Sequence, residues 1–312
     1  MISVVVPVYN NGDTVDALAQ RVAAALAPAP YELIFVNDGS RDESIERLRA
    51  IAAADPNVRV ISLCKNFGQH PAMGAGFEHA RGDSIVLMDA DLQDHPEDIP
   101  TLIDRLRDDV DIVYTCKRGA DAGLSIRVTS LVYHHLFSRI VGVSVPPNIG
   151  TFRAFNRKVL AALLRYRERS ILYGPLMFFM GFRSIFIEVE HHARPSGKSA
   201  YSFGKRLALA MSSLMSYTDI PHRLSLYVGG ILFAGSVVYG IAVTVQYLLF
   251  GSAFPAGFTL ILLVLILMLG NLMMTLGIIG SYLFRVYLEV LDRPRYLIAE
   301  KINFESRVNG AE

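Results

Sequence analysis

The sequence has little cysteine, no tryptophan and almost no net charge. Its 312 residues include two cysteines and carry a formal net charge of +1. Two cysteines cannot form a disulfide framework. Because Cys64 and Cys116 both lie in apolar stretches, we expect buried thiols in a reducing compartment. A nearly neutral chain also lacks the basic surface of a nucleic-acid-binding protein, so we expect no nucleic-acid partner.

Several motifs of common cofactor sites are missing as well. The first apolar stretch, residues 2–8, is not followed by the G-x-G-x-x-G pattern of dinucleotide-binding proteins. The eight histidines show no H-E-x-x-H or Cys/His spacing, which argues against zinc chemistry. The amino-terminal residues lack the basic region of a signal peptide, so we expect the first domain to stay in the cytosol.

Two long stretches contain no charged side chain. Residues 224–250 and 258–284 include no Asp, Glu, Lys or Arg, and each exceeds the ~20 residues that cross a bilayer. A buried hairpin of a soluble core is the alternative, but core helices are rarely apolar on every face for this length. We therefore predict two transmembrane helices. Basic residues lie only outside the pair, so the positive-inside rule places both outer ends in the cytosol.

The apolar runs divide the chain into five parts. A cytosolic domain is expected over residues 1–200, and a cytosolic tail over 285–312. Between them lie an amphipathic segment at 201–223 and the two spans, 224–250 and 258–284. The stripe of Phe203, Leu207, Met211 and Leu214 suits either the membrane interface or packing on the cytosolic domain. The glycine pairs Gly229–Gly230 and Gly277/Gly280 would allow close helix packing, which is compatible with a homo-oligomer.

The first half of the chain alternates short apolar runs with helical patterns. Strands are expected at residues 2–8, 31–36, 58–63 and 84–88, each followed by a helix. This order predicts an α/β fold with a mainly parallel, Rossmann-like sheet. Further strands are expected at 111–116, near 152–157 and at 184–191, where apolar and polar residues alternate.

Carboxylates gather where the fourth expected strand ends. Asp89 and Asp91 follow an apolar run directly, with Gln93 and Asp94 close behind. Open α/β sheets bind ligands at the carboxyl ends of their strands, and carboxylates there suit a hard divalent cation such as Mg²⁺. Asp109 and Asp111 form the same Asp-x-Asp pattern before a strand, and we interpret that pair as a solvated turn.

A third carboxylate, Asp38, follows the second expected strand in the segment N-D-G-S. Gly39 suits a tight turn, and Ser40 suits a helix cap. Turn formation alone would explain Gly39 and Ser40, whereas Asp38 could accept hydrogen bonds from a nucleobase or ribose. A cation site without a Walker loop, beside an acidic strand end, suggests a nucleotide-diphosphate donor whose leaving diphosphate the cation would neutralise.

Several ordered motifs resemble the inverting GT-A glycosyltransferases of family 2. They are P-V-Y-N at residues 7–10, N-D-G-S at 37–40, K-N-F-G at 65–68 and D-A-D-L-Q-D at 89–94. Later motifs resemble the polyprenyl-phosphate glycosyltransferases, a group that includes dolichyl-phosphate mannose synthase and bacterial undecaprenyl-phosphate sugar transferases. These are K-R at 117–118, F-R-A-F-N-R at 152–157, R-x-x-G-x-S-x-Y at 194–201 and R-P-R-Y at 293–296.

The resemblance implies a role for each matching residue. The nucleotide sugar would be bound by Pro7, Tyr9, Asn10, Asp38, Lys65 and Asp89. Mg²⁺ or Mn²⁺ would be held by Asp89, Asp91 and Gln93. The lipid phosphate would be bound by Arg118, Arg127, Ser130, Arg194 and Ser199. The catalytic groups would be Asp91, Arg118, Arg127 and Arg194. Asn37 and Thr151 stand where relatives often carry acids, which leaves the donor sugar open.

The resemblance implies inverting transfer of one sugar from a UDP- or GDP-sugar to a polyprenyl phosphate at the cytosolic face of a bacterial inner membrane. No general base is needed, because a phosphomonoester is largely ionised at neutral pH. A membrane-anchored, catalytically silent nucleotide-sugar-binding scaffold is the alternative from another class. A cytosolic hydroxyl-directed transferase is disfavoured by the paired spans. A processive polysaccharide synthase is disfavoured because its Q-x-x-R-W motif needs a tryptophan, and the chain has none.

Overall fold

The computed structural model describes residues 1–106, 109–118, 149–168, 171–190 and 257–304, together with parts of 227–249. The chain divides into two compact units. The first contains Met1–Ala200 and Pro294–Glu312, and the second contains Tyr201–Arg293.

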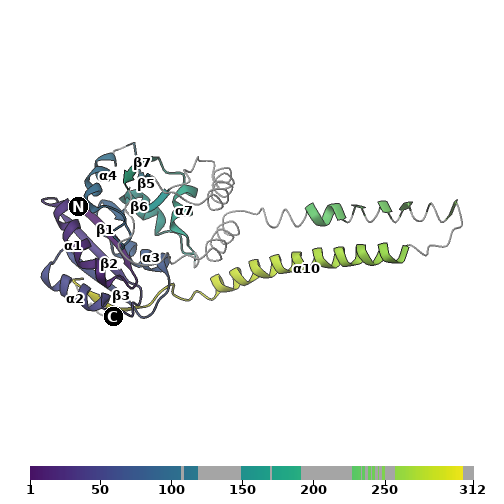
Figure 1. The fold of residues 1–312 in the computed structure, drawn as a ribbon, viewed down its shortest axis with the longest axis horizontal. Helices are drawn as coiled ribbons and strands as arrows, with labels where there is room; N and C mark the ends of the chain where they lie inside the picture. Colours follow the sequence, from purple (N-terminus) through teal and green to yellow (C-terminus); the bar gives the residue numbers. More distant parts are fainter. Residues whose placement is uncertain are drawn as a thin grey trace, which may run out of the picture. The chain divides into compact units, whose positions relative to one another are not determined.

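The first unit is built on a mixed sheet with helices on both faces (Figure 1). Among the described residues its strand order is β7-β5-β6-β4-β1-β2-β3-β8. The amino-terminal half alternates strands and helices in the expected order: β1 (Ile2–Val8), α1 (Gly12–Leu26), β2 (Tyr31–Asn37), α2 (Ser44–Ala54), β3 (Val58–Leu63), α3 (Gln69–His79), β4 (Ser84–Leu87), the short 3₁₀ turn η1 (Pro96–Asp98) and α4 (Ile99–Arg105).

The second half of this unit adds both edges of the sheet. Its elements are β5 (Ile112–Arg118), β6 (Ile149–Asn156), α6 (Arg157–Leu163), α7 (Tyr173–Phe179), β7 (Ser184–Glu190) and β8 (Ile298–Ile302). The four strands β4, β1, β2 and β3 run parallel, as predicted. β6 and β8 are antiparallel to their neighbours β4 and β3, so the sheet is mixed.

Alternate residues of the central strands face the two helical layers. Val4 and Val6 of β1 and Phe35 of β2 are fully buried and belong to the core that packs on α1. Their neighbours Val5 and Val36 face α3 instead, where Gly76 allows close contact. Because side chains alternate across a strand, an uninterrupted valine-rich run is what a strand covered on both faces requires.

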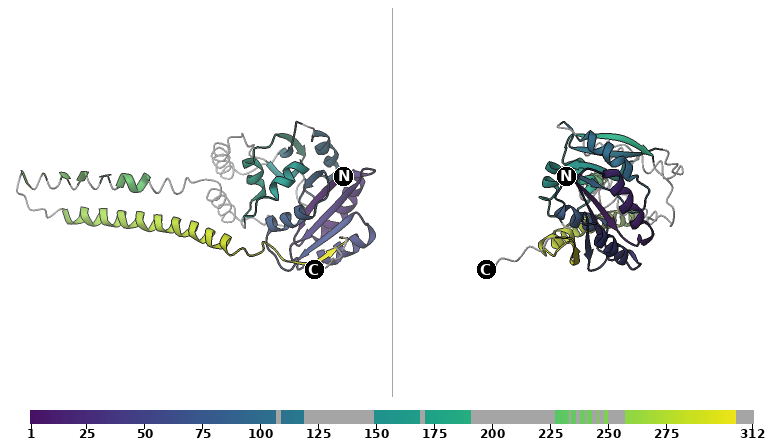
Figure 2. Two further views of the ribbon diagram at one scale, coloured as in Figure 1. Left: turned by 180° about the vertical axis from the view of Figure 1, so that it is seen from behind. Right: turned by 90° about the vertical axis from the view of Figure 1, so that its left-hand side faces the viewer.

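The last described strand, β8, was not predicted. Residues from Pro294 onward belong to the first unit, and Ile298–Ile302 pairs antiparallel with β3 (Figure 2, yellow strand). The side chain of Asn303 donates hydrogen bonds to the carbonyl groups of Ala52 and Val58, at 2.6 and 2.8 Å. The segment assigned to a tail therefore closes one edge of the sheet, which removes an exposed strand edge from β3.

The second unit contains the helix α10 (Gly257–Val290), which begins close to the predicted second span and continues beyond it. Among the described residues, Met268–Val290 is the one helical stretch long and apolar enough to cross a membrane, and a soluble core helix can pass the same test. Residues 227–232 of the first apolar run are helical. Two spans remain a prediction. A Cβ on Gly229 would lie 2.8 Å from the Asn271 side chain, so these two helical segments approach closely at that point.

Two local predictions were wrong. Cys64 is exposed because β3 ends at Leu63, one residue earlier. Asp111 is not part of a solvated turn: it is 7% exposed. Its carboxylate accepts hydrogen bonds from the Asn156 side chain at 2.9 Å and the Arg183 backbone at 3.3 Å. Asp111 thus links the start of β5 to Asn156 at the end of β6 and to Arg183 just before β7. It lies at the opposite end of the strands from Asp89 and Asp91.

Candidate active site at the carboxyl edge of the sheet

The predicted donor residues lie at the carboxyl ends of four adjacent parallel strands, β4, β1, β2 and β3. β1 lies between β4 and β2, with Val5 opposite Leu87 and Val8 opposite Asn37. After β1 the chain moves to β2 and β3 on one side, and then returns to β4 on the other. This reversal of strand order is the topological switch point at which open α/β sheets bind ligands. Pro7, Tyr9, Asp38, Asp89 and Asp91 all lie at or just beyond strand ends at this edge.

Hydrogen bonds from backbone amides to side-chain oxygens join the loops after β1 and β2. The Asn10 amide donates to Ser40 Oγ at 3.0 Å, and the Arg41 amide donates to Asn10 Oδ1 at 2.9 Å. Asn10 has a positive φ of 55°, a conformation that asparagine tolerates better than most residues. Ser40 therefore does not cap α2, which begins four residues later at Ser44. It holds the two loops together. Tyr9, beside Asn10, is 44% exposed.

Asp38 is buried and accepts two backbone hydrogen bonds. The amides of Phe67 and Gly68 donate to its two carboxylate oxygens at 2.7 and 2.9 Å. Burial raises the pKa of the Asp38 carboxyl, and the two N–H groups offset only part of that rise. Asp38 thus organises the loop between β3 and α3. That loop also carries Lys65, whose ammonium lies 5.1 Å from the centre of the Phe67 ring.

The loop after β4 carries the predicted cation ligands. The Gln69 side-chain amide donates to Asp89 Oδ1 at 2.9 Å, and the Gln93 backbone amide donates to Asp91 Oδ1 at 3.2 Å. Thr14 Oγ1 of α1 donates to the Ala90 carbonyl at 2.6 Å. This short loop is therefore tied to the elements that follow both β1 and β3.

The donor set of this loop fits a hard divalent cation. Two carboxylates and the Gln93 amide supply only oxygen ligands, all on partly buried residues, which is the chemistry that Mg²⁺ and Mn²⁺ prefer. The described part of the chain contains no group of three His, Cys, Asp or Glu side chains able to hold a metal ion by themselves. A cation here would take its remaining ligands from diphosphate oxygens and water, as Mg²⁺ commonly does in phosphate sites.

The predicted acceptor-phosphate residues are described only in part. Arg118 is the last residue of β5, and its side chain is not described. Arg127, Ser130, Arg194 and Ser199 lie outside the described residues. Their roles remain predictions.

Two residues near the acids were not assigned from sequence. Gln69 contacts Asp89 directly from the first turn of α3. Arg153 lies on β6 opposite Leu87, which precedes the acidic loop by one residue. The Arg153 guanidinium donates to the carbonyl groups of Thr151 and Gly150 and lies 5.3 Å from the Tyr114 ring. Gln69 directly follows the K-N-F-G motif, and Arg153 lies within F-R-A-F-N-R. Their position in or beside these motifs could have identified them from the sequence.

Arg153 is a buried cation in the middle of the sheet. It is 7% exposed. Burial lowers the pKa of its guanidinium, and the negative charges of Asp89 and Asp94 are among the groups that counter this effect. Burial, together with the positive charge of Arg153, lowers the pKa of His70 to about 4. His70 is therefore neutral at pH 7, and its buried Nδ1 has no hydrogen-bond partner among the described residues.

The mixed sheet with a Rossmann-like parallel core defines an α/β fold of the GT-A type. Residues 3–164 match the family described as Glycosyl transferase family 2, and the chain belongs to that family. A similar fold is found in glucosyl-3-phosphoglycerate synthase from Mycobacterium tuberculosis in complex with Mg²⁺ and uridine diphosphate. The TM-score is 0.53 at 20% identity, over 70% of this chain and 79% of that chain.

Relatives are similar over nearly their full length. The chain is 34% identical over 317 residues to undecaprenyl-phosphate 4-deoxy-4-formamido-L-arabinose transferase of Yersinia enterocolitica, covering 100% of this chain and 96% of that protein. It is 33% identical over 305 residues to a prophage-derived bactoprenol glucosyl transferase of Shigella flexneri, covering 95% and 97%. The resemblance to undecaprenyl-phosphate sugar transferases inferred from the motifs is thereby confirmed.

Proposed function

We propose that this glycosyltransferase transfers one sugar from a nucleotide-diphosphate sugar to a polyprenyl phosphate, with inversion, at the cytosolic face of a bacterial inner membrane. The observation that carries the proposal is the joint position of Asp38, Asp89 and Asp91 at the switch point of the sheet. End-to-end similarity to relatives named for undecaprenyl-phosphate and bactoprenol acceptors supports the lipid acceptor.

The donor would lie across the ends of β1, β2 and β4. Pro7, Tyr9 and Asn10 would contact the nucleoside from one side, and Asp38 and Lys65 from the other. The half-exposed Tyr9 ring offers a surface for a base. Asp38 already accepts two backbone hydrogen bonds, and it would therefore contribute to donor binding mainly by holding the loop after β3 in place. Its oxygens could also accept a further hydrogen bond from the donor.

The acidic loop would bind the donor diphosphate through a cation. Asp89, Asp91 and Gln93 would hold Mg²⁺ or Mn²⁺, which would supply Lewis-acid stabilisation of the leaving diphosphate. The chain's own contribution is to hold these oxygen ligands in place: Gln69 orients Asp89, and the Gln93 amide orients Asp91. Such preorganisation avoids a reorganisation cost in the transition state.

The acceptor would need positioning rather than activation. A polyprenyl phosphate has a second pKa near 6 and is largely ionised at neutral pH, so its oxygen can attack the anomeric carbon without a general base. Arg118, Arg127 and Arg194, with Ser130 and Ser199, would bind this phosphate, because the guanidinium fork matches phosphate oxygens. The apolar runs at 224–250 and 258–284 would keep the domain at the membrane surface, where the lipid phosphate lies.

A donor panel tests the proposal. Membranes containing the chain are incubated with undecaprenyl phosphate and each labelled UDP- or GDP-sugar, with and without Mg²⁺ or Mn²⁺. We expect one donor to give a cation-dependent glycolipid of inverted anomeric configuration, measured by mass spectrometry and NMR. No glycolipid with any donor, combined with tight UDP or GDP binding, would instead support the catalytically silent scaffold.

A further inference from the structure

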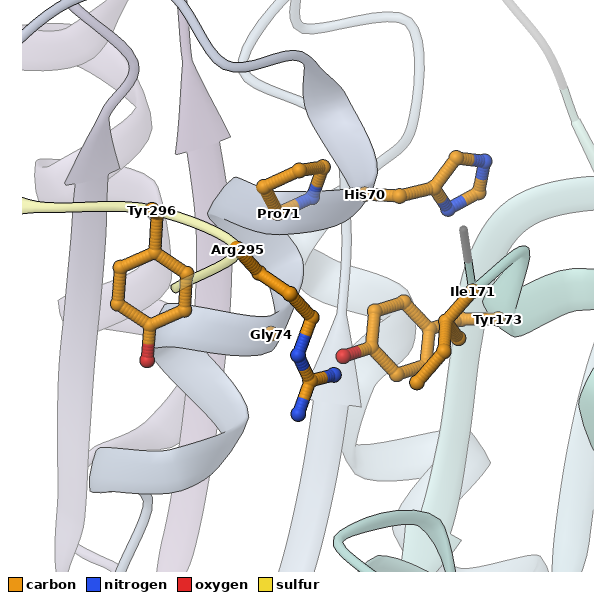
Figure 3. A pocket seen from close by; sticks show the side chains of 7 residues that line it. All are labelled: His70, Pro71, Gly74, Ile171, Tyr173, Arg295 and Tyr296. Atoms are coloured by element: carbon orange, nitrogen blue, oxygen red, sulfur yellow. The ribbon is translucent and has the colours of Figure 1, made fainter. Parts of the chain in front are cut away.

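Arg295 and Tyr296, in the segment that follows α10, contact the carboxyl-terminal end of α3. The amino-terminal end of the same helix contacts Asp89. Tyr296 Oη donates to Glu78 Oε2 at 2.5 Å, and Arg295 Nη2 lies 3.9 Å from Glu78 Oε1. The positive charge of Arg295 also acts on Tyr173, where it offsets part of the rise that burial causes in the pKa of the hydroxyl. Figure 3 shows the Arg295 guanidinium directed toward the Tyr173 hydroxyl, with Tyr296 on its other side. All of these residues belong to the first unit.

The opposite end of α3 contacts the candidate active site. Gln69, the first residue of the helix, donates to Asp89, and the amides of Phe67 and Gly68, just before it, donate to Asp38. Glu78 lies nine residues beyond Gln69, which corresponds to about 14 Å along a helix. One short helix therefore joins the Arg295–Tyr296 contact to both strand-end acids.

The packing of α3 leaves it little room to bend or slide. A Cβ on Gly76 would lie 2.3 Å from Val5 Cγ1 of β1, and a Cβ on Gly74 would lie 2.6 Å from the Tyr173 hydroxyl. The pocket lined by His70, Pro71, Gly74, Ile171, Tyr173, Arg295 and Tyr296 lies along this face of the helix. Because closely packed interiors transmit strain, we expect a displacement at one end of α3 to reach the other end.

We infer that Arg295 and Tyr296 are positioning residues: by holding the carboxyl-terminal turn of α3, they fix its amino-terminal end against Asp38 and Asp89. The inference deepens the proposed function, because it names a part of the chain outside the strand-end loops on which donor binding depends. It also assigns a role to the R-P-R-Y motif, whose described residues contact neither Asp38 nor Asp89.

Hydrogen exchange of the full-length chain in detergent tests this inference without any substrate. In Tyr296→Phe the hydroxyl donor is lost, and in Glu78→Gln the acceptor loses its charge. We expect the amides of residues 67–70 to exchange about fivefold faster in both variants, the change that corresponds to one ordinary hydrogen bond. Amides of β1 and β2 should be unchanged. The matched control is Arg49→Gln, which removes the 2.7 Å Arg49–Glu300 ion pair from the same returning segment without touching α3.

Three results would overturn the inference. Faster exchange confined to residues 74–79 and 296–304 would show that the contact is local. Faster exchange throughout the sheet would show a general loss of stability. Equally fast exchange of residues 67–70 in Arg49→Gln would show that loosening any contact of the segment after α10 has this effect, so that Arg295 and Tyr296 have no special role. Failure to form a glycolipid would refute the proposed function and leave the exchange result intact, so the two ideas fail separately.

Discussion

The Asp38 carboxylate accepts a hydrogen bond from the Gly68 amide at 2.9 Å, which links the end of β2 to the residue just before α3. The Phe67 amide, at 2.7 Å, binds the other oxygen. Hydrogen bonds to a charged group contribute about 1.5–3 kcal/mol each. Asp38→Asn keeps one acceptor and places an N–H₂ group against a backbone N–H. We expect the free energy of unfolding to fall by about 2 kcal/mol, measured by urea denaturation.

The same substitution should weaken donor binding, because the loop that carries Lys65 loses its anchor. The control is Asp13→Asn on the exposed first turn of α1, which removes the same charge at a distance. Unchanged nucleotide affinity in Asp38→Asn would contradict the placement of Asp38 in the donor site.

Asp91→Ala should abolish glycolipid formation while the protein remains folded. The substitution removes one of the two carboxylates of the oxygen donor set, and divalent cation sites of this kind need them. Isothermal titration with Mn²⁺ in the presence of UDP or GDP should show at least a tenfold loss of cation affinity. The control is Asp109→Ala, which makes the same change at an exposed residue of the second Asp-x-Asp pair. It should change neither glycolipid formation nor cation affinity. Full activity in Asp91→Ala would remove it from the cation site.

Gly39→Ala should disrupt the loop after β2. Gly39 has a φ of +65°, and a Cβ there would lie 2.4 Å from the Lys65 carbonyl carbon. Left-handed backbone costs a non-glycine residue roughly 1–2 kcal/mol, and the clash with backbone adds to this. Gly181→Ala is the matched control, because Gly181 has a φ of +67° but nothing within 4 Å of the added Cβ.

We expect Gly181→Ala to lower the free energy of unfolding by about 1 kcal/mol with donor affinity unchanged. Gly39→Ala should lower it further and also raise the donor KM. If the two variants lose the same free energy of unfolding, the close approach of Gly39 to the backbone of Lys65 does not contribute to stability.

His70 should make the free energy of unfolding depend on pH. Its pKa is about 4 in the folded chain, against an ordinary value of 6.5, because burial and the Arg153 charge disfavour the imidazolium. A lowered pKa means that the unfolded state binds the proton more tightly. The stabilising contribution is therefore complete above pH 6.5 and is lost as the pH falls toward 4. The full difference is about 3 kcal/mol.

His70→Leu should remove this dependence. The difference in unfolding free energy between the wild type and the variant should change by up to about 3 kcal/mol between pH 7.5 and 4.5. A difference that stays constant with pH would show that His70 is not a buried neutral imidazole.

The order of strands and helices in the amino-terminal half, and the position of the acids in it, were predictable because they depend on local patterns. Each central strand is an apolar run, and its carboxyl end is marked by a polar residue or a turn. Asp38, Asp89 and Asp91 could be assigned to one edge because parallel strands joined by helices have all their carboxyl ends on the same side. The second Asp-x-Asp pair does lie before a strand, but its interpretation as a solvated turn was wrong, because Asp111 is buried.

The antiparallel partners and the contacts around the acids had no such local pattern. β8 joins β3, and Asn303 reaches Ala52 across 251 residues of sequence. Gln69 at the start of α3 meets Asp89 after β4, and Arg153 comes beside the acidic loop because β6 pairs antiparallel with β4. Periodicity reports which face of a segment is buried, and it carries no information about which distant segment covers that face. The sequence alone therefore determined the elements and the chemistry of the strand ends. The tertiary structure decided which residues hold those ends in place.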